Sequence, residues 1–200
     1  MNTDSSNLPS CIAFGGAQCI AEGDLHAVAA AVKQWQAVHA DTSILIFDGQ
    51  TSEPIEIDLR GTVQDVLNRL PKTLPPVAAD EPVVRTPGRP KLGVVSREVT
   101  LLPRHWEWLS QQPGGASVAL RKLVEAASRA NEIKDQQRRA QEATYRFMSA
   151  IAGNLPGYEE ATRALFADQP EQFGVHTEDW PLDIREHVRR LALRVFLPQA

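Results

Sequence analysis

The chain has 200 residues, of which 42% are hydrophobic and 23% are charged, and its formal net charge is −4. These fractions are typical of a globular protein and exclude a disordered tail or a fibrous repeat. No stretch approaches the roughly 20 consecutive apolar residues of a membrane-spanning helix, and a polar N-terminus with only two cysteines in the chain leads us to expect a reducing, bacterial-type cytoplasm.

Residues 11–70 are predicted to form a small α+β unit with the element order ββαββα. Gly15-Gly16 separates two short β-prone runs, which is typical of a hairpin. Asp24 is a good N-cap for a helix, and residues 44–47 form an apolar run of strand length. Apolar and acidic residues then alternate over 55–59, which predicts a half-buried strand before a short closing helix. We expect the helices to cover one face of this sheet.

Residues 71–93 are predicted to be a basic, proline-rich linker. Six of the fourteen prolines fall between Pro71 and Pro90, and the apolar periodicity is lost there. Such a segment is extended and semi-stiff, so it separates two units without fixing their orientation.

Residues 94–200 are predicted to be a strand followed by helices. Residues rich in β-formers predict the strand over 94–102, and Pro103 suits the first turn of a helix. A Pro113-Gly114-Gly115 turn separates that helix, in which Trp106 and Leu109 are expected to point inward, from the next. The expected helices cover residues 105–112, 117–152 (with weak amphipathicity and a possible bend at 131–139), 158–167 and 181–197.

Basic residues concentrate in the middle of the sequence. Residues 1–70 hold 3 basic and 9 acidic side chains, residues 71–150 hold 13 and 8, and residues 151–200 hold 5 and 8. Over residues 85–104, five cations face a single acid, Glu98. Such a local excess favours a site for an anion such as nucleic acid, phosphate or an acidic partner. Over residues 121–146, by contrast, the charges alternate in sign and are interpreted as a solvated helix face.

The sequence from Arg97 to Val124 resembles the ribbon-helix-helix DNA-binding module. A β-prone run ending at Pro103, a short helix, a glycine turn and a longer helix follow one another in that order. In that family two chains pair their strands into a ribbon that enters the major groove, and the N-terminus of each second helix holds a phosphate. The resemblance implies a homodimer with residues 97–102 as the ribbon and Ser117 at the phosphate.

The predicted ribbon has few side chains that read bases. A base-reading face carries hydrogen-bonding groups at alternate positions, because the major groove presents donors and acceptors. Arg97 is the only such group on one face, while Glu98 and Thr100 lie on the other. The alternative therefore stays open that this strand and its two helices pack within their own domain.

A second, shorter resemblance precedes the predicted ribbon. Pro87-Gly88-Arg89-Pro90-Lys91 resembles part of the AT-hook, whose Gly-Arg-Pro core lies in the narrow minor groove of A·T-rich DNA. The usual core has an arginine before the glycine, where this chain has Pro87. A basic linker without a ligand is the alternative. The candidate nucleic-acid-binding residues are Arg85, Arg89, Lys91, Arg97, Thr100, Arg104 and Ser117.

Most of the chain is also similar to a bacterial family known only as a domain of unknown function. The similarity rests on residues 88–124, on Leu155-Pro156-Gly157-Tyr158-Glu159-Glu160-Ala161 and on Trp180-Pro181. It implies a bacterial protein and supplies no mechanism.

Catalytic and cofactor motifs do not stand out. The five histidines have no two-His metal spacing, Cys11 and Cys19 are eight residues apart, and nucleotide-binding and nucleophile-elbow motifs are missing. We therefore expect no cofactor, no metal and no membrane partner. The favoured function is DNA binding by a dimeric transcriptional regulator. The alternatives are a protein–protein interaction module and, less favoured, an enzyme whose site joins histidines and acids of the C-terminal helices.

Overall fold

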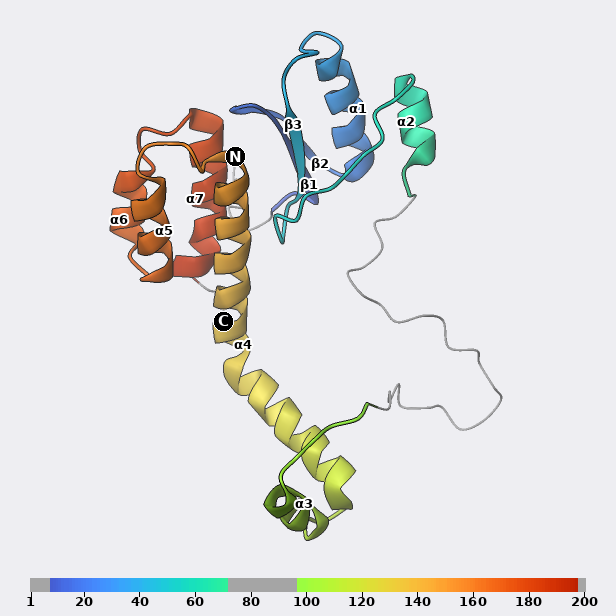
Figure 1. Cartoon of the computed structure of the whole chain (residues 1–200), viewed down its shortest axis with the longest axis vertical. Coiled ribbons are helices and arrows are strands. Elements are labelled where there is room, and N and C mark those ends of the chain that lie inside the picture. Colours follow the sequence, from blue (N-terminus) through green and yellow to red (C-terminus); the bar gives the residue numbers. More distant parts are fainter. Residues whose placement is uncertain (1–7, 72–96, 198–200) are drawn as a thin grey trace, which may run out of the picture. The chain divides into compact units, whose positions relative to one another are not determined.

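A three-stranded antiparallel sheet forms the N-terminal part of the protein. The computed structural model describes residues 8–71 and 97–197, whose elements are shown in Figure 1. β1 (Cys11–Gly15) lies between β2 (Gln18–Gly23) and β3 (Ile44–Asp48). The predicted hairpin is confirmed, because β1 and β2 pair antiparallel across a turn in which Gly16 has a φ of +58°. Glycine adopts this left-handed conformation without steric cost.

The two helices of the N-terminal part begin at residues whose side chains cap them. α1 (Leu25–Gln36) starts after Asp24, whose Oδ1 accepts hydrogen bonds from the N–H groups of His26 and Ala27, both at 3.0 Å. α2 (Val63–Arg69) starts with a reciprocal capping box between Thr62 and Asp65. Each cap satisfies N–H groups that a helix leaves open in its first turn.

The fourth strand expected over residues 55–59 does not form. One bridge joins Phe47 to Pro54, and the Ile55 N–H donates to the Ile46 carbonyl at 2.8 Å, after which the chain leaves β3. The alternation itself is real, because the side chains of Ile55, Ile57 and Leu59 are half-buried while the acids between them are exposed. The alternating pattern indicates which side of the segment is buried. That burial does not require the segment to pair with a strand. The order is therefore ββαβα.

The C-terminal half is helical, as expected, and with the sheet it makes the fold α+β. The long helix is unbroken across the predicted bend, and a short helix at residues 170–176 was not predicted. The helices are α3 (Pro103–Ser110), α4 (Gly115–Ile151), α5 (Tyr158–Phe166), α6 (Pro170–His176) and α7 (Leu182–Phe196). Within the described ranges, no helix has both the length and the apolarity needed to cross a membrane.

The strand expected over residues 94–102 is not seen at its described positions. Residues 97–102 form no ladder with any strand, and α3 begins directly after them at Pro103. Residues 94–96 and most of the predicted linker lie outside the described residues. A β-prone segment becomes a strand only when a neighbouring edge accepts its backbone hydrogen bonds, and the described residues 97–132, which belong to one compact unit, contain no strand.

The chain divides into two compact units, and the division falls inside α4. Residues 1–74 and 133–200 form one unit, and residues 75–132 form the other. We call the described residues 8–71 and 133–197 the sheet unit, and the described residues 97–132 the two-helix unit. The division predicted from the sequence instead put all helices after residue 94 together.

Helices cover both faces of the sheet, and not one face as expected. On one face Ile12 and Phe14 of β1 pack with residues of the C-terminal helices such as Phe147 and Leu191. On the other face Cys11 and Ala13 pack with α1, through side chains such as Val28. All five residues of β1 are buried, which is the property of a strand covered on both sides.

Candidate nucleic-acid interface

The structure places four of the seven predicted site residues. Arg85, Arg89 and Lys91, together with the whole AT-hook-like segment, lie outside the described residues. The remaining four, Arg97, Thr100, Arg104 and Ser117, all belong to the two-helix unit. The described part of the candidate interface is therefore the stretch from Arg97 to the first turns of α4.

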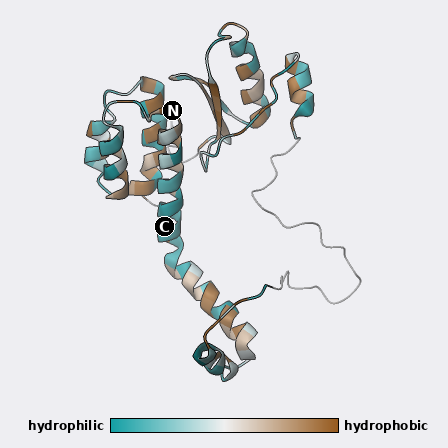
Figure 2. Ribbon diagram, viewed as in Figure 1, coloured by the Kyte–Doolittle hydropathy of each residue, from teal (hydrophilic) through white to brown (hydrophobic). Residues whose placement is uncertain are grey.

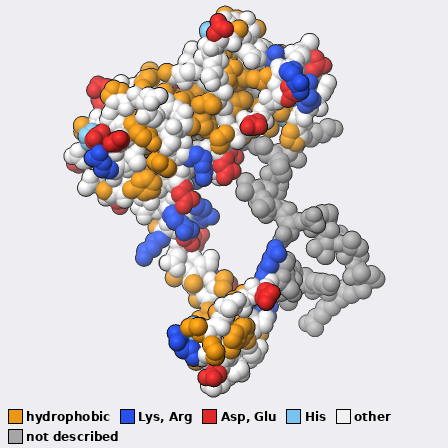
Figure 3. Space-filling view, in the orientation of Figure 1, with side chains coloured by type: hydrophobic (Ala, Val, Ile, Leu, Met, Phe, Trp, Pro, Cys, Tyr) orange, Lys and Arg blue, Asp and Glu red, His pale blue; other side chains and the backbone are white. Residues whose placement is uncertain are grey.

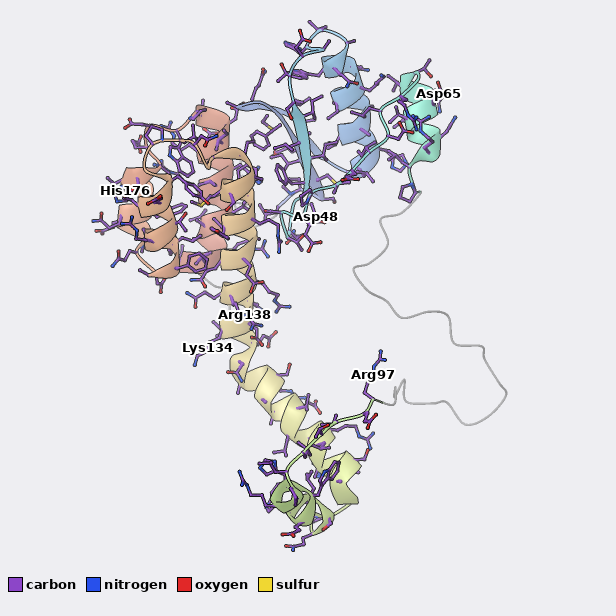
Figure 4. All side chains as sticks on the ribbon, in the orientation of Figure 1. Asp48, Asp65, Arg97, Lys134, Arg138 and His176 are labelled. Atoms are coloured by element: carbon purple, nitrogen blue, oxygen red, sulfur yellow. The ribbon has the colours of Figure 1, made fainter. Side chains whose placement is uncertain are left out.

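An extended, exposed segment leads into α3. The side chains of Arg97, Glu98, Val99 and Thr100 are exposed, and Figure 4 shows Arg97 at the start of this segment. Leu102 is the N-cap of α3 in an extended conformation, with φ −67° and ψ 149°. The segment therefore carries two of the predicted site residues, Arg97 and Thr100, in solvent.

α3 has one buried and two exposed large apolar side chains. Leu109 points inward as predicted and is 3% exposed. Trp106, which was also expected in the core, is 43% exposed, so that prediction is wrong. Trp108, two residues further along the helix, is exposed as well. Two helices alone enclose too little space to bury aromatic side chains on more than one face.

A two-glycine turn joins α3 to α4. Gly114 and Gly115 have φ values of +85° and +75°, and a Cβ at Gly114 would lie 3.1 Å from Cβ of Val118. Both observations require glycine at position 114. Ser117 is exposed in the first turn of α4, where backbone N–H groups have no acceptor within the helix and favour an anion. Arg121 Nε donates to the Ser117 carbonyl at 3.2 Å.

Cations of the two-helix unit are open to solvent. Arg104, Arg121 and Lys122 are exposed, and no described carboxylate forms an ion pair with any of them. Figure 3 shows Lys and Arg side chains at the surface around α3 and the start of α4.

Apolar side chains are exposed on the same unit. Every residue from Arg121 to Glu132 is exposed, although several of these residues are apolar, and Val124 is 65% exposed. Figure 2 shows the hydrophobic positions along this half of α4. The exposed large apolar residues of the two-helix unit's segment and helices are Val99, Leu102, Trp106, Trp108, Leu123 and Val124.

One histidine of the C-terminal helices, His187, is part of the core of the sheet unit. His187 is 2% exposed, and its ring packs against Phe14 and Phe147 with centroid distances of 5.9 and 4.5 Å. Arg190 Nη2 donates to Nδ1 of His187 at 3.0 Å, so Nδ1 is the acceptor nitrogen of a neutral ring. Burial, followed by the charge of Arg190, lowers the pKa of His187 to about 4.

Other catalytic chemistry has little support among the described residues. Burial raises the thiol pKa of both Cys11 and Cys19 to about 11, which keeps them protonated, whereas a nucleophilic cysteine acts as the thiolate. Over residues 8–71 and 97–197, no three His, Cys, Asp or Glu side chains form a group that could hold a metal ion.

A feature that sequence reasoning missed is a set of polar contacts between β2 and α7. Asp183 Oδ2 accepts a hydrogen bond from the Cys19 N–H at 2.7 Å, and Arg190 Nη2 forms an ion pair with Glu22 at 2.7 Å. The partners are more than 160 residues apart in sequence. No local pattern carries a signal for such a pair.

Comparison with known proteins gives one match. The family described as "Uncharacterized protein conserved in bacteria (DUF2239)" matches residues 10–192. No curated protein and no solved structure matches the chain.

Proposed function

The chain belongs to the bacterial family DUF2239, as its sequence similarity indicated, and from this premise and the geometry of the two-helix unit we propose that it binds DNA as a homodimer and acts in transcriptional regulation. The observation that carries the proposal is the largely exposed segment 97–102, which has no strand assignment, directly before two helices joined by a glycine turn. This is the order of elements in a ribbon-helix-helix chain taken without its partner.

Dimerisation explains what the single two-helix unit leaves unsatisfied. Its described residues bury the side chains of only Leu109 and Ala119 below the surface, while six large apolar side chains remain exposed. Contiguous exposed apolar surface of this kind is typical of a protein interface. In a second copy, residues 97–102 would find an antiparallel partner in the same segment of the other chain, and Leu123 and Val124 would find a covering helix.

DNA is favoured over other partners by the charges around that surface. Arg104, Arg121 and Lys122 are exposed cations without a described carboxylate partner. The first turn of α4, with Ser117, offers backbone N–H groups to a phosphate. Arg89 and Lys91 precede the segment in sequence and would add phosphate or minor-groove contacts.

The test is binding of a random duplex by the full chain at several salt concentrations. Replacing Arg89, Lys91 and Arg97 with Ala should weaken binding and lower the slope of log affinity against log salt by about three, since each lost phosphate contact removes about one. A matched control replaces Arg60, Arg163 and Arg185, whose carboxylate partners lie in the sheet unit, with Ala. It should leave both quantities unchanged. If the variant that lacks Arg89, Lys91 and Arg97 binds the duplex as tightly as the unaltered chain, the proposal is contradicted.

A protein–protein interaction module is the second candidate, and Glu98 favours it. Its exposed carboxylate lies on the segment that would enter the groove, where it would repel phosphates. Failure of micromolar protein to retard any duplex at low salt, with the two-chain mass retained in solution, would select this candidate over DNA binding.

A further inference from the structure

Three arginines of the sheet unit differ from all its other described arginines. Each of the others has a carboxylate oxygen within 4.0 Å, whereas Arg139, Arg146 and Arg194 have no such partner among residues 8–71 and 97–197. The paired ones are Arg60 and Arg69 with Asp58, Arg138 with Asp135, Arg163 with Glu159 and Glu160, Arg185 and Arg189 with Glu178, and Arg190 with Glu22.

Two of the three side chains, Arg146 and Arg194, meet at the turn that follows β3, and Arg139 lies close enough to Arg194 for its charge to lower the Arg194 pKa. Arg146 of α4 donates through Nη1 to the Thr51 carbonyl, and Arg194 of α7 donates through Nη1 to the adjacent Gln50 carbonyl at 3.3 Å. Arg139, two turns before Arg146 on α4, donates through Nε to the carbonyl of Asp135 in its own helix. Backbone carbonyls therefore position these guanidinium groups without neutralising them. Figure 4 labels Asp48 in this turn and Arg138, the neighbour of Arg139, on α4.

The carboxylate of Asp48, the last residue of β3, accepts hydrogen bonds from uncharged donors of the turn. Asp48 Oδ1 accepts from the N–H groups of Gln50 and Thr51, at 2.9 and 2.8 Å, and from the Thr51 hydroxyl at 3.0 Å. These bonds hold the shape of the turn and therefore of the two carbonyls that the arginines bind. The same turn contains Ser52, whose buried hydroxyl has no hydrogen-bond partner among the described residues.

The electrostatics of the cluster are unfavourable as it stands. Arg194 is half-buried, and burial together with the charge of Arg139 lowers the pKa of its guanidinium. Both effects act against the charged form, and no described acid opposes them. Like charges that are held together at a cost in free energy are relieved by a bound anion.

We propose that Arg139, Arg146 and Arg194 form a binding site for a dianionic phosphate group, such as the monoester of a small phosphorylated metabolite. A guanidinium group presents a planar set of donors that matches two phosphate oxygens. Two guanidinium groups on adjacent carbonyls of one turn, with a third cation close to one of them, suit a dianion better than the single negative charge of a DNA phosphodiester. The site belongs to the sheet unit and its residues are not those of the proposed DNA interface, so neither proposal rests on the other.

The primary experiment titrates the full chain with inorganic phosphate and follows binding by calorimetry, with sodium chloride adjusted to constant ionic strength. Arg139→Gln is the informative variant, because among residues 8–71 and 97–197 the Arg139 side chain bonds to its own helix alone, and its loss should not disturb the fold. We expect it to weaken phosphate binding by about tenfold, the effect of one charge-assisted hydrogen bond. Arg194→Gln should weaken binding at least as much.

The matched control is Arg163→Gln, which removes the same charge from an exposed position on α5. It should bind phosphate as the unaltered chain does. Equal phosphate binding by the unaltered chain and by Arg139→Gln would overturn the proposal, as would no binding by the unaltered chain.

A second arm separates a small phosphate from the DNA backbone. A nucleoside 5′-monophosphate should bind at least as tightly as inorganic phosphate, and Arg139→Gln should weaken it in parallel. If instead Arg139→Gln weakens duplex binding while neither small anion binds, the cluster contacts a phosphodiester and the proposal fails.

Discussion

The sheet unit and the two-helix unit use their apolar residues in opposite ways. In the sheet unit, large side chains such as Phe14, Phe47 and Phe147 are fully buried between β1 and the C-terminal helices. In the two-helix unit, Trp108 and Val124 are at least half exposed, and the described buried side chains are those of Leu109 and Ala119. Two short helical segments bury too little area to offset the entropy of folding. The contrast teaches that the described residues of the sheet unit enclose a core, whereas those of the two-helix unit leave most of their large apolar side chains exposed, as the proposed dimer would require.

The largest expected effect comes from truncating the centre of the sheet unit. Phe147 contacts the rings of Phe14, Phe47 and His187, with centroid distances of 5.3, 5.2 and 4.5 Å. Phe147→Ala should lower the free energy of unfolding by about 3–5 kcal/mol, because it opens a cavity in a packed core. Urea unfolding measures this. Leu123→Ala, the control in the two-helix unit, should change the free energy of unfolding of the sheet unit by about 0.5 kcal/mol or less. Equal losses of stability in the two variants would contradict the difference between the units.

Acid should destabilise the sheet unit through His187. Its pKa is about 4 when folded and about 6.5 when unfolded, so below pH 6.5 the unfolded chain binds a proton that the folded chain does not. The stability that His187 provides is therefore present above pH 6.5 and is lost as the pH falls toward 4. The loss between pH 7 and pH 5 should be about 2 kcal/mol. His187→Gln should lack this part of the pH dependence in urea titrations, and an identical slope in both proteins would show that His187 is accessible when folded.

Replacing a turn glycine should affect only the two-helix unit. Gly114→Ala puts a Cβ at a φ of +85° and 3.1 Å from Val118, which should cost about 1–2 kcal/mol. Hydrogen exchange should then rise in α3 and the first turns of α4 and stay unchanged in β1. Gly174→Ala, in α6 where an added Cβ has open space, is the control and should not increase exchange anywhere.

The smallest effect is expected for the ion pair between β2 and α7. Arg190 and Glu22 are 32% and 47% exposed, so solvent screens their attraction. Glu22→Gln should lower the free energy of unfolding by about 0.5 kcal/mol. Thermal unfolding at low and high salt checks this, and a loss comparable to that of Phe147→Ala would mean that the pair is far less solvated than its exposure indicates.

Local chemistry was readable from the sequence, and contacts between distant segments were not. Asp24 begins α1 as predicted, because a cap depends only on the next three residues. The alternation at residues 55–59 predicted burial correctly and strand pairing incorrectly, because pairing depends on an edge elsewhere. The second helix layer over Ile12 and Phe14 comes from residues more than 120 positions away, beyond the reach of any local pattern.

The candidate sites show the same limit. Ser117 and the glycine turn were found because their chemistry lies in consecutive residues. Arg139 and Arg146 lie in the stretch 121–146 that was interpreted as a solvated helix face, and Arg194 was not singled out, since nothing local reveals that Arg146 and Arg194 bind the turn at residues 50–51. Arg194 is separated from that turn by 144 positions.

The most direct test of the account is the mass of the full chain in solution, measured by sedimentation equilibrium over the micromolar range. If a second copy covers the two-helix unit, the unaltered chain has the mass of two chains. The double variant Leu123→Ser, Val124→Ser, which alters only side chains that are exposed in the single chain, then has the mass of one chain and remains folded. A one-chain mass for the unaltered protein at every concentration would contradict the account.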